Sequence, residues 1–157
     1  NFPYKPGSQA GQPGDGPNGF GKTNIYGALY PFGYGLSYTM FEYSNLVFDK
    51  DKILRDSNVV LHVTIKNTGT RKGDEVVQLY VKDEVTSVTV YEKQLRGFER
   101  ISLAPNESKT VTFTLKPSDI SLLNLKMERV VEPGFFEVQI GSSSEDIRLK
   151  KRFEVIK

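Results

Sequence analysis

Acidic side chains occur in close pairs along the chain, and paired carboxylates can cleave glycosidic bonds or bind calcium. The pairs are Asp49/Asp51, Asp74/Glu75, Asp83/Glu84 and Glu145/Asp146. A retaining glycosidase holds its two carboxylates about 5–5.5 Å apart across a sugar-sized cleft. All four pairs lie near predicted turns or strand ends, where acidic residues are usually solvated. We therefore expect surface charge and no catalytic pair.

The sequence gives little indication of a metal-binding or cofactor-binding site. Calcium at Asp49–Asp51 or at Asp83–Glu84 would lack the ligand spacing of a calcium loop. The chain has no cysteine, which removes thiolate zinc sites and disulfides. Its one histidine, His62, lies on the polar side of an alternating segment and has no predicted ligand or nucleophile beside it. We expect a surface or inter-strand histidine, with no metal and no cofactor.

One segment matches the pattern of a phosphate-binding loop. It runs over Gly16–Thr23, with Lys22 in the lysine position. Such a loop needs a strand before it and a helix after it, because the helix N-terminus receives the phosphates. No apolar strand precedes Gly16, and Pro31 follows too closely for a helix. We expect this match to be accidental.

Charge and hydropathy exclude two classes of partner. The net charge is +2, which is too small to attract nucleic acid or an anionic membrane. No apolar run approaches the ~18 residues that a membrane span needs. The basic stretch Arg148, Lys150, Lys151 and Arg152 is interpreted as protection of an edge strand against sheet-to-sheet aggregation.

Alternating apolar residues predict an all-β domain. Turn signals separate about seven short strands, and no long helical pattern appears, which favours a β-sandwich. The strands are expected near residues 59–65, 75–82, 93–103, 111–115, 129–131, 136–140 and 147–155. Gly97 indicates a bulge, and Pro117–Ile120 a short helical turn with Ser118 as a candidate cap.

The strand periodicity also predicts which side chains share the core. We expect one core formed by residues on the apolar strand faces: Leu61, Val63, Val77, Leu79, Phe113, Val138 and Ile140. In the last strand, Lys151 interrupts the apolar face formed by Ile147, Leu149, Phe153 and Val155.

Aromatic residues are concentrated between Tyr30 and Tyr43, which include six of them. If each of the six rings buried about 100 Å², removing this surface from water would contribute on the order of 15 kcal/mol of free energy as an upper estimate. An exposed patch of that size exceeds what monomers usually tolerate. The rings either belong to the sandwich core and first strand or form a docking surface. We expect Phe41 and Tyr43 inside the sandwich and Tyr30–Tyr34 at an interface.

Four segments together resemble one known family. They are Leu29–Phe41, Asp74–Val81, Gln94–Phe98 and Pro133–Gly141. They are similar to the C-terminal fibronectin type III-like domain of glycoside hydrolase family 3 enzymes, the β-glucosidases and β-xylosidases. The resemblance implies a fibronectin III/immunoglobulin-like β-sandwich over residues 37–157. It also implies an irregular Gly/Pro-rich arm over residues 1–36, which joins the sandwich to the catalytic region.

The resemblance further implies a non-catalytic accessory domain that stabilises the catalytic domains of the same polypeptide. The parent enzyme would remove terminal β-linked sugars with carboxylates outside this chain, in the periplasm or after secretion. A homo-oligomer is compatible with this interpretation, whereas direct carbohydrate binding is not expected. The candidate docking residues are Tyr30, Phe32, Tyr34, Leu36 and Tyr38.

Two alternatives remain open from the sequence. A carbohydrate-binding module would need solvent-facing aromatic rings, and Tyr80, Tyr91 and Phe135 are candidates for a stacking platform. An adhesion or assembly module would need a large symmetric aromatic interface. A coplanar exposed pair of rings would favour the first alternative.

Overall fold

The computed structural model describes residues 30–85, 87–88 and 92–157, and the fold is almost entirely β-structure. The strands are β1 (Phe41–Phe48), β2 (Lys52–Leu54), β3 (Val59–Asn67), β4 (Gly73–Asp83), β5 (Gln94–Leu103), β6 (Ser108–Leu115), β7 (Leu122–Leu123), β8 (Arg129–Val130), β9 (Gly134–Gly141) and β10 (Ile147–Ile156). One short 3₁₀ helix, Pro117–Asp119, follows β6.

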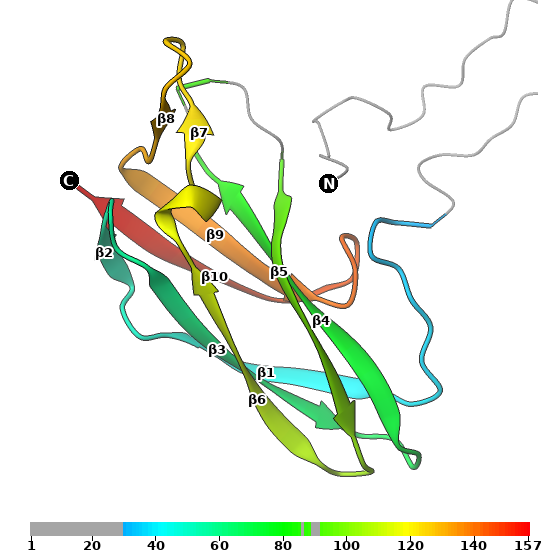
Figure 1. Ribbon diagram of the computed structural model, residues 1–157. Helices are drawn as coiled ribbons and strands as arrows, with labels where there is room; N and C mark the ends of the chain where they lie inside the picture. The colour runs from blue at the N-terminus through cyan, green and yellow to red at the C-terminus, as the bar shows by residue number, and fades with distance from the viewer. Residues whose placement is uncertain (1–29, 86, 89–91) are drawn as a thin grey trace, which may run out of the picture.

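Two sheets face each other (Figure 1). One has the order β1-β3-β6, and the other has the order β2-β10-β9-β4-β5. The small hairpin β7–β8 projects beyond one end of the sandwich. The predicted all-β sandwich is confirmed. The short strands β2 and β7 were not predicted, because three and two residues respectively are too few to show an alternating pattern.

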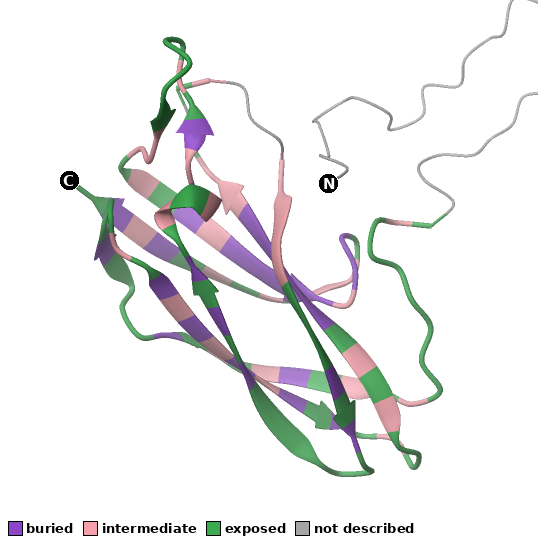
Figure 2. Cartoon of the chain, viewed as in Figure 1, coloured by how far each residue is buried: buried purple, intermediate pink, exposed green. Residues whose placement is uncertain are grey.

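The core lies between the sheets, and Figure 2 shows the alternation of buried and exposed residues along the strands that build it. In β3, buried residues alternate with less buried ones from Val59 to Asn67. Leu61 pairs with Phe113 and Val63 with Val111, so the apolar faces of β3 and β6 are in register. All seven predicted core residues are buried in one cluster. The predicted core is confirmed.

The centre of the larger sheet is β4, which lies between β9 and β5. Every residue from Val77 to Val81 is buried, as expected for a strand covered on both faces. The predicted bulge is present in β5, because Leu79 pairs with Gly97 and Tyr80 with Leu95. Arg96 is the additional residue between them.

Strand β10 agrees with the prediction over its basic stretch and differs from it at its end. Leu149–Arg152 pair with β9 alone, so this part is an edge, whereas β2 pairs in parallel with Glu154–Ile156, where β10 becomes the second strand of its sheet. The interruption of its apolar face by Lys151 has a physical explanation. The Lys151 ammonium lies 5.1 Å from the centre of the Phe48 ring and 3.2 Å from an Asp51 oxygen, so its stem follows the core while its charge is paired.

The predicted turn after β6 is present, but Ser118 is not its cap. Lys116 occupies the N-cap position, and its backbone N–H donates to the Asp119 carboxylate at 2.8 Å. Pro117 follows directly, because its fixed φ and missing N–H suit the first helical position. Among the described residues, no helix is long and apolar enough to cross a membrane.

Candidate interaction surface: the aromatic strap

The segment Tyr30–Met40, here called the aromatic strap, lies along the sandwich without joining either sheet. It runs beside the larger sheet to the start of β1 (Figure 1, blue). Its backbone is irregular, with one turn in which Tyr34 N–H donates to Pro31 O at 3.0 Å. Pro31, Gly33 and Gly35 make the segment a poor strand, as the sequence indicates.

The first part of the strap is anchored through its backbone. Ser144 N–H donates to Phe32 O at 2.8 Å, and the Gln78 amide donates to Gly33 O at 2.9 Å. Gln78 is buried in β4, and its carbonyl oxygen accepts a hydrogen bond from the Tyr80 hydroxyl at 2.6 Å. Gly33 is required at this contact, because its φ is +79° and a Cβ would lie 2.0 Å from the Gln78 side chain.

The other end of the strap is anchored where β3 ends. Thr68 N–H donates to Met40 O at 2.8 Å, and the Thr39 hydroxyl donates to the Asn67 side chain at 2.7 Å. Gly69 leaves space for this contact, because a Cβ there would lie 2.1 Å from the Thr39 hydroxyl oxygen. Both anchors therefore hold the strap mainly by polar groups.

Asn67 is the hub of the second anchor and was not recognised from the sequence. Its side chain is fully buried. Its oxygen also accepts from Gly69 N–H, and its nitrogen donates to Arg71 O at 2.7 Å and Leu103 O at 3.0 Å. The sequence shows this residue only as the start of an Asn-Thr-Gly turn. Its long-range partners could not be inferred from local pattern.

The apolar side chains of the strap remain exposed. The exposed fractions are Tyr30 66%, Phe32 38%, Tyr34 49%, Leu36 89%, Tyr38 94% and Met40 68%. By contrast, Tyr43 is buried and Phe41 packs against the core, as expected. The five candidate docking residues thus lie together on one segment that the described part of the chain leaves uncovered.

Beneath the strap lies a groove of about 750 Å³. Its apolar walls include Tyr34, Phe41 and Phe98. Its polar lining includes Glu75, Asp146 and Arg148, which come from β4, the loop after β9 and β10. The groove therefore combines aromatic rings with ionisable groups at one end of the sandwich.

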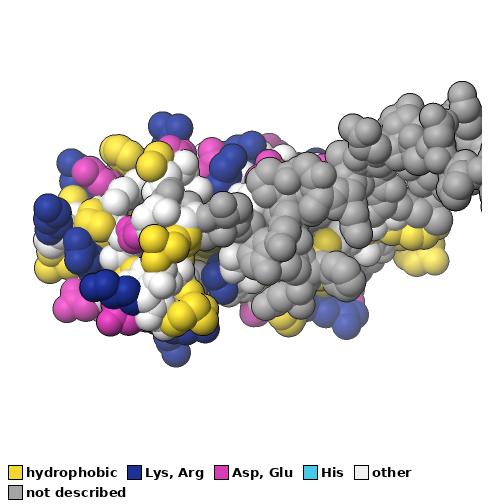
Figure 3. All heavy atoms as spheres, turned by 90° about the horizontal axis from the view of Figure 1, so that it is seen from above, with side chains coloured by type: hydrophobic (Ala, Val, Ile, Leu, Met, Phe, Trp, Pro, Cys, Tyr) yellow, Lys and Arg dark blue, Asp and Glu magenta, His cyan; other side chains and the backbone are white. Residues whose placement is uncertain are grey.

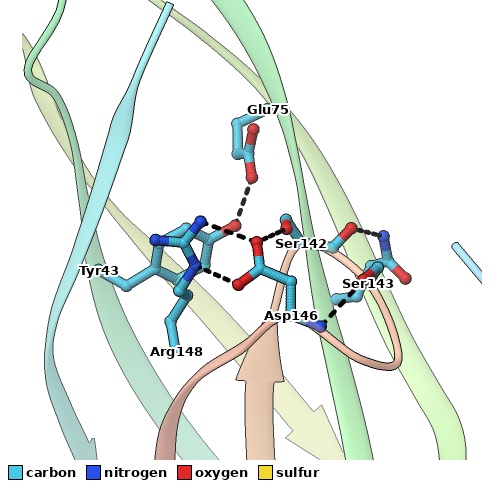
Figure 4. Close-up of polar contacts among 7 residues, drawn as sticks. Tyr43, Glu75, Ser142, Ser143, Asp146 and Arg148 are labelled. Carbon is cyan, nitrogen blue, oxygen red and sulfur yellow. Dashed lines mark hydrogen bonds and ion pairs between the residues drawn. The ribbon is translucent and has the colours of Figure 1, made fainter. Parts of the chain in front are cut away.

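The polar groups of the groove form two hydrogen-bonded sets (Figure 4). Tyr43 donates its hydroxyl proton to Glu75 at 2.5 Å. Arg148 donates to both oxygens of Asp146, with Nε–Oδ1 at 2.6 Å and Nη2–Oδ2 at 2.7 Å. The Ser142 hydroxyl donates to the same carboxylate at 2.6 Å. Asp146 is thereby fixed on both oxygens.

Burial and hydrogen bonding shift the pKa values of these groups in different directions. Burial, and then the bond to Glu75, raises the pKa of the Tyr43 hydroxyl. Burial also raises the pKa of Glu75, against the lowering effect of the Tyr43 bond. The hydrogen bond from Arg148 lowers the pKa of Asp146. Such opposed shifts occur at acid–base sites. Here, however, Asp146 is fully engaged by its partners, so the arrangement favours binding and support over proton transfer.

The expectation that the acidic pairs are all solvated is therefore wrong in part. Glu75 is half-buried in the groove. Asp83 is also half-buried, and burial raises its pKa to about 6. Their neighbours Asp74 and Glu84 pair with arginines, at 2.5 Å from Arg100 and 2.6 Å from Arg152 respectively. The described residues contain no group of three or more side chains suited to hold a metal ion.

His62 has an inter-strand position on the outer face of the smaller sheet, as predicted. Its Nδ1 lies 2.9 Å from the Thr112 hydroxyl of β6, and its Nε2 lies 3.0 Å from an Asp49 oxygen. The chain Asp–His–Thr has the residue types of a hydrolytic triad. This set lies at the surface, where all three residues are partly or fully exposed, and its Asp49 also borders a groove of about 280 Å³ beside β2. We interpret it as a cross-strand link.

The candidates for a sugar-stacking platform are not brought together. Tyr80 is buried, with 2% of its surface exposed, so it cannot stack on a ligand. Phe135 is half exposed. Tyr91 and the loop pattern Gly16–Thr23 lie outside the described residues. The exposed rings of Tyr30 and Tyr34 are 5.4 Å apart but tilted by 32°, so they do not form a coplanar platform.

The end of the sandwich that carries the β7–β8 hairpin has side chains of both charges. Seen from above, positive and negative side chains are interspersed with hydrophobic ones on the described part (Figure 3). The exposed apolar residues of this end include Leu125 and Met127 at the tip of the β7–β8 hairpin. This face therefore differs from the strap, whose exposed side chains are almost all apolar.

Comparison with known proteins shows that the chain is similar to one part of several longer proteins. The model of the fibronectin type III-like domain matches residues 75–144. The chain is 50% identical over 131 residues to a putative β-xylosidase of Formosa agariphila, covering 83% of this chain and 17% of that protein. It is 48% identical over 128 residues to thermostable β-glucosidase B of Acetivibrio thermocellus, covering 81% of this chain and 17% of that protein.

Solved structures agree with these sequence matches. The β-glucosidase of Listeria innocua in complex with gluconolactone superposes with a TM-score of 0.81 at 33% identity, covering 99% of this chain and 22% of that one. β-Glucosidase 3B of Thermotoga neapolitana gives a TM-score of 0.76 at 38% identity, covering 82% of this chain and 18% of that one. The chain thus spans about a sixth of the length of the curated relatives it matches. It belongs to the fibronectin type III-like domains, in the form that family 3 β-glucosidases and β-xylosidases carry.

Proposed function

We propose that this chain is the C-terminal accessory domain of a family 3 glycoside hydrolase and that it stabilises the catalytic domains by docking onto them. The aromatic strap is the docking element in this proposal. The sandwich would act as a rigid body that holds the strap in place. The arm over residues 1–36 would connect the sandwich, residues 37–157, to the catalytic region.

The exposed strap is the observation that carries the proposal. Its backbone is anchored at Phe32–Gly33 and at Thr39–Met40, and its large apolar side chains are exposed to solvent, from 38% at Phe32 to 94% at Tyr38. Burying a side chain such as Leu36 or Tyr38 is worth about 1.5–3 kcal/mol. An apolar patch of this kind usually marks an interaction site. A covalently attached catalytic region is the partner that the short coverage of the relatives supports.

The sugar chemistry would belong to the rest of the polypeptide. The parent would remove terminal β-linked sugars, as the names of the relatives suggest, with carboxylates outside this chain. Within the groove, Asp146 is engaged on both oxygens and leaves no free nucleophile beside Glu75. One relative is a periplasmic β-glucosidase, which supports a parent that acts in the periplasm or outside the cell.

The coding sequence upstream of Asn1 gives the first test. The proposal requires it to encode a catalytic region with a nucleophilic carboxylate, in frame with this chain. An upstream region that encodes no enzyme would overturn the proposal without any biochemical work.

The second test compares the full-length polypeptide with the isolated chain. The double substitution Leu36→Ser and Tyr38→Ser removes the two most exposed apolar side chains of the strap. In the full-length protein we expect heat inactivation to begin several degrees lower, because about 3–5 kcal/mol of apolar burial is lost. In the isolated chain the unfolding temperature should hardly change, since these side chains contact little of their own sandwich.

A matched control is available at the opposite end of the fold. Leu125→Ser with Met127→Ser removes two apolar side chains of similar exposure from the β7–β8 hairpin. This pair should leave heat inactivation of the full-length protein unchanged. Equal destabilisation of the isolated chain and the full-length protein by the strap pair would mean that the strap packs on its own sandwich.

A further inference from the structure

Glu75 has an unusual position for a carboxylate in this domain. It enters the groove beneath the strap from β4 and is half-buried there. Its one hydrogen bond between side chains is the 2.5 Å contact in which Tyr43 donates. A carboxylate has about four lone-pair sites, so most of its acceptor capacity is still available. No salt bridge joins Glu75 to a cation among the described residues.

The neighbouring charges in the groove are already paired with each other. Arg148 directs both of its contacts to Asp146. Asp74, which also lines the groove, pairs with Arg100. Glu75 is thus the carboxylate of this groove that forms no ion pair in the described structure, although Arg148, which is bonded to Asp146, attracts it from a longer distance. Burying an unpaired carboxylate is costly, and a partner of opposite charge would remove that cost.

The walls of the groove suit a cation in a second way. Tyr34, Phe41 and Phe98 present aromatic rings to the same space. Aromatic faces attract guanidinium and ammonium groups, most strongly where water is excluded. A neutral sugar could hydrogen-bond to Glu75, but it would leave the negative charge uncompensated. Charge complementarity therefore favours a cationic occupant.

We propose that the groove beneath the strap receives a cationic side chain, arginine or lysine, from the catalytic region, and that this side chain pairs with the Glu75 carboxylate. The inference rests on the proposed docking function and adds a specific ionic contact to it. The apolar strap would cover the pair and exclude water from it. Docking would then have an apolar part, carried by the strap, and an electrostatic part, carried by Glu75.

The test uses Glu75→Gln in the full-length protein. Glutamine keeps an oxygen that can accept the Tyr43 hydrogen bond, so the isolated chain should unfold as before. In the full-length protein we expect heat inactivation to become about tenfold faster, as loss of one partner of a desolvated charge pair predicts. High salt should accelerate inactivation of the wild type and have less effect on the variant.

Glu42→Gln is the matched control. Glu42 precedes Tyr43 on β1 and is exposed, so its substitution removes the same charge outside the groove. It should change neither the inactivation rate nor its salt dependence.

Chemical labelling of the full-length protein identifies the partner residue and distinguishes an arginine partner from a lysine partner. If the partner is arginine, phenylglyoxal should modify one arginine of the catalytic region in the Glu75→Gln protein that is protected in the wild type. If it is lysine, a carbodiimide should cross-link that lysine to Glu75 in the wild type. A cross-link from Glu75 to a lysine of this chain, or neither result, would overturn the inference.

The two proposals fail in distinguishable ways. If the Leu36→Ser/Tyr38→Ser pair leaves the full-length protein unchanged, the strap does not dock and both proposals fall. If that pair destabilises it but Glu75→Gln behaves as the wild type, docking stands and only the ionic contact is overturned.

Discussion

At the scale of single residues, the strap depends on a glycine whose role is conformational and steric. Gly33 adopts a φ of +79°, and a Cβ there would lie 2.0 Å from Gln78. We expect Gly33→Ala to displace the strap from Gln78 and to cost about 1–2 kcal/mol of unfolding free energy. Hydrogen exchange at the Ser144 N–H, which donates to Phe32 O, should become faster.

Gly35 provides the internal comparison for this prediction. No heavy atom lies within 4 Å of a Cβ placed on it. Gly35→Ala should therefore leave both urea unfolding and exchange at Ser144 close to wild type. Equal effects of the two substitutions would show that the Gly33 contact does not hold the strap.

Asp83 gives a prediction about pH. Burial raises its folded pKa to about 6 from a reference value of 3.8, so the folded state binds more protons than the unfolded state between these pH values. Stability contributed by this residue is therefore lost as the pH rises through this window. We expect Asp83→Asn to stabilise the chain at pH 7 by about 1 kcal/mol, after allowance for solvent screening.

Urea unfolding at pH 7 and pH 3.5 would check this expectation. Most of the advantage of Asp83→Asn should disappear at pH 3.5, where the aspartate is protonated in the folded state and mostly protonated in the unfolded state. Asp56→Asn, at an exposed turn, removes the same charge without the burial and should show no such pH-dependent gain. A constant difference between Asp83→Asn and the wild type at both pH values would argue against desolvation as the cause.

At the scale of elements, Asn67 connects the strap to the ends of β3 and β5. Its amide donates to Arg71 O and Leu103 O and accepts from the Thr39 hydroxyl and Gly69 N–H. Asn67→Asp would place a buried carboxylate against two carbonyl oxygens. We expect a loss of about 3 kcal/mol in denaturant unfolding. Asn58→Asp, at an exposed position, should cost little.

The elements also show how far the sequence could predict this structure. The periodicity of Val59–Ile65 and the apolar run of β4 depend on neighbours in the chain, so these strands and their buried faces could be predicted. The contact of Gln78 with Gly33 joins residues 45 positions apart. Asn67 and Leu103 are 36 apart. No local pattern reports such pairs, so the strap anchors could not be predicted. For the same reason the burial of Glu75 appears only when the sheets assemble.

At the scale of the whole molecule, the sandwich core and the strap are separate structures. The core cluster draws its described residues from the strands and the 3₁₀ region, and none of them belongs to the strap. The chain can therefore close its hydrophobic core while the strap side chains stay outside. This separation explains why a stable domain can carry an apolar surface that it does not cover itself.

The uncovered strap predicts a difference in dye binding between the isolated chain and the full-length protein. The fluorescent probe ANS reports exposed hydrophobic surface. We expect the folded isolated chain to bind ANS, and the Leu36→Ser/Tyr38→Ser pair to remove most of the signal, because these side chains are 89% and 94% exposed. The Leu125→Ser/Met127→Ser pair should remove much less, since its two side chains do not belong to a continuous apolar segment. In the full-length protein the strap signal should be absent, and undiminished ANS binding there would show that the strap remains in water.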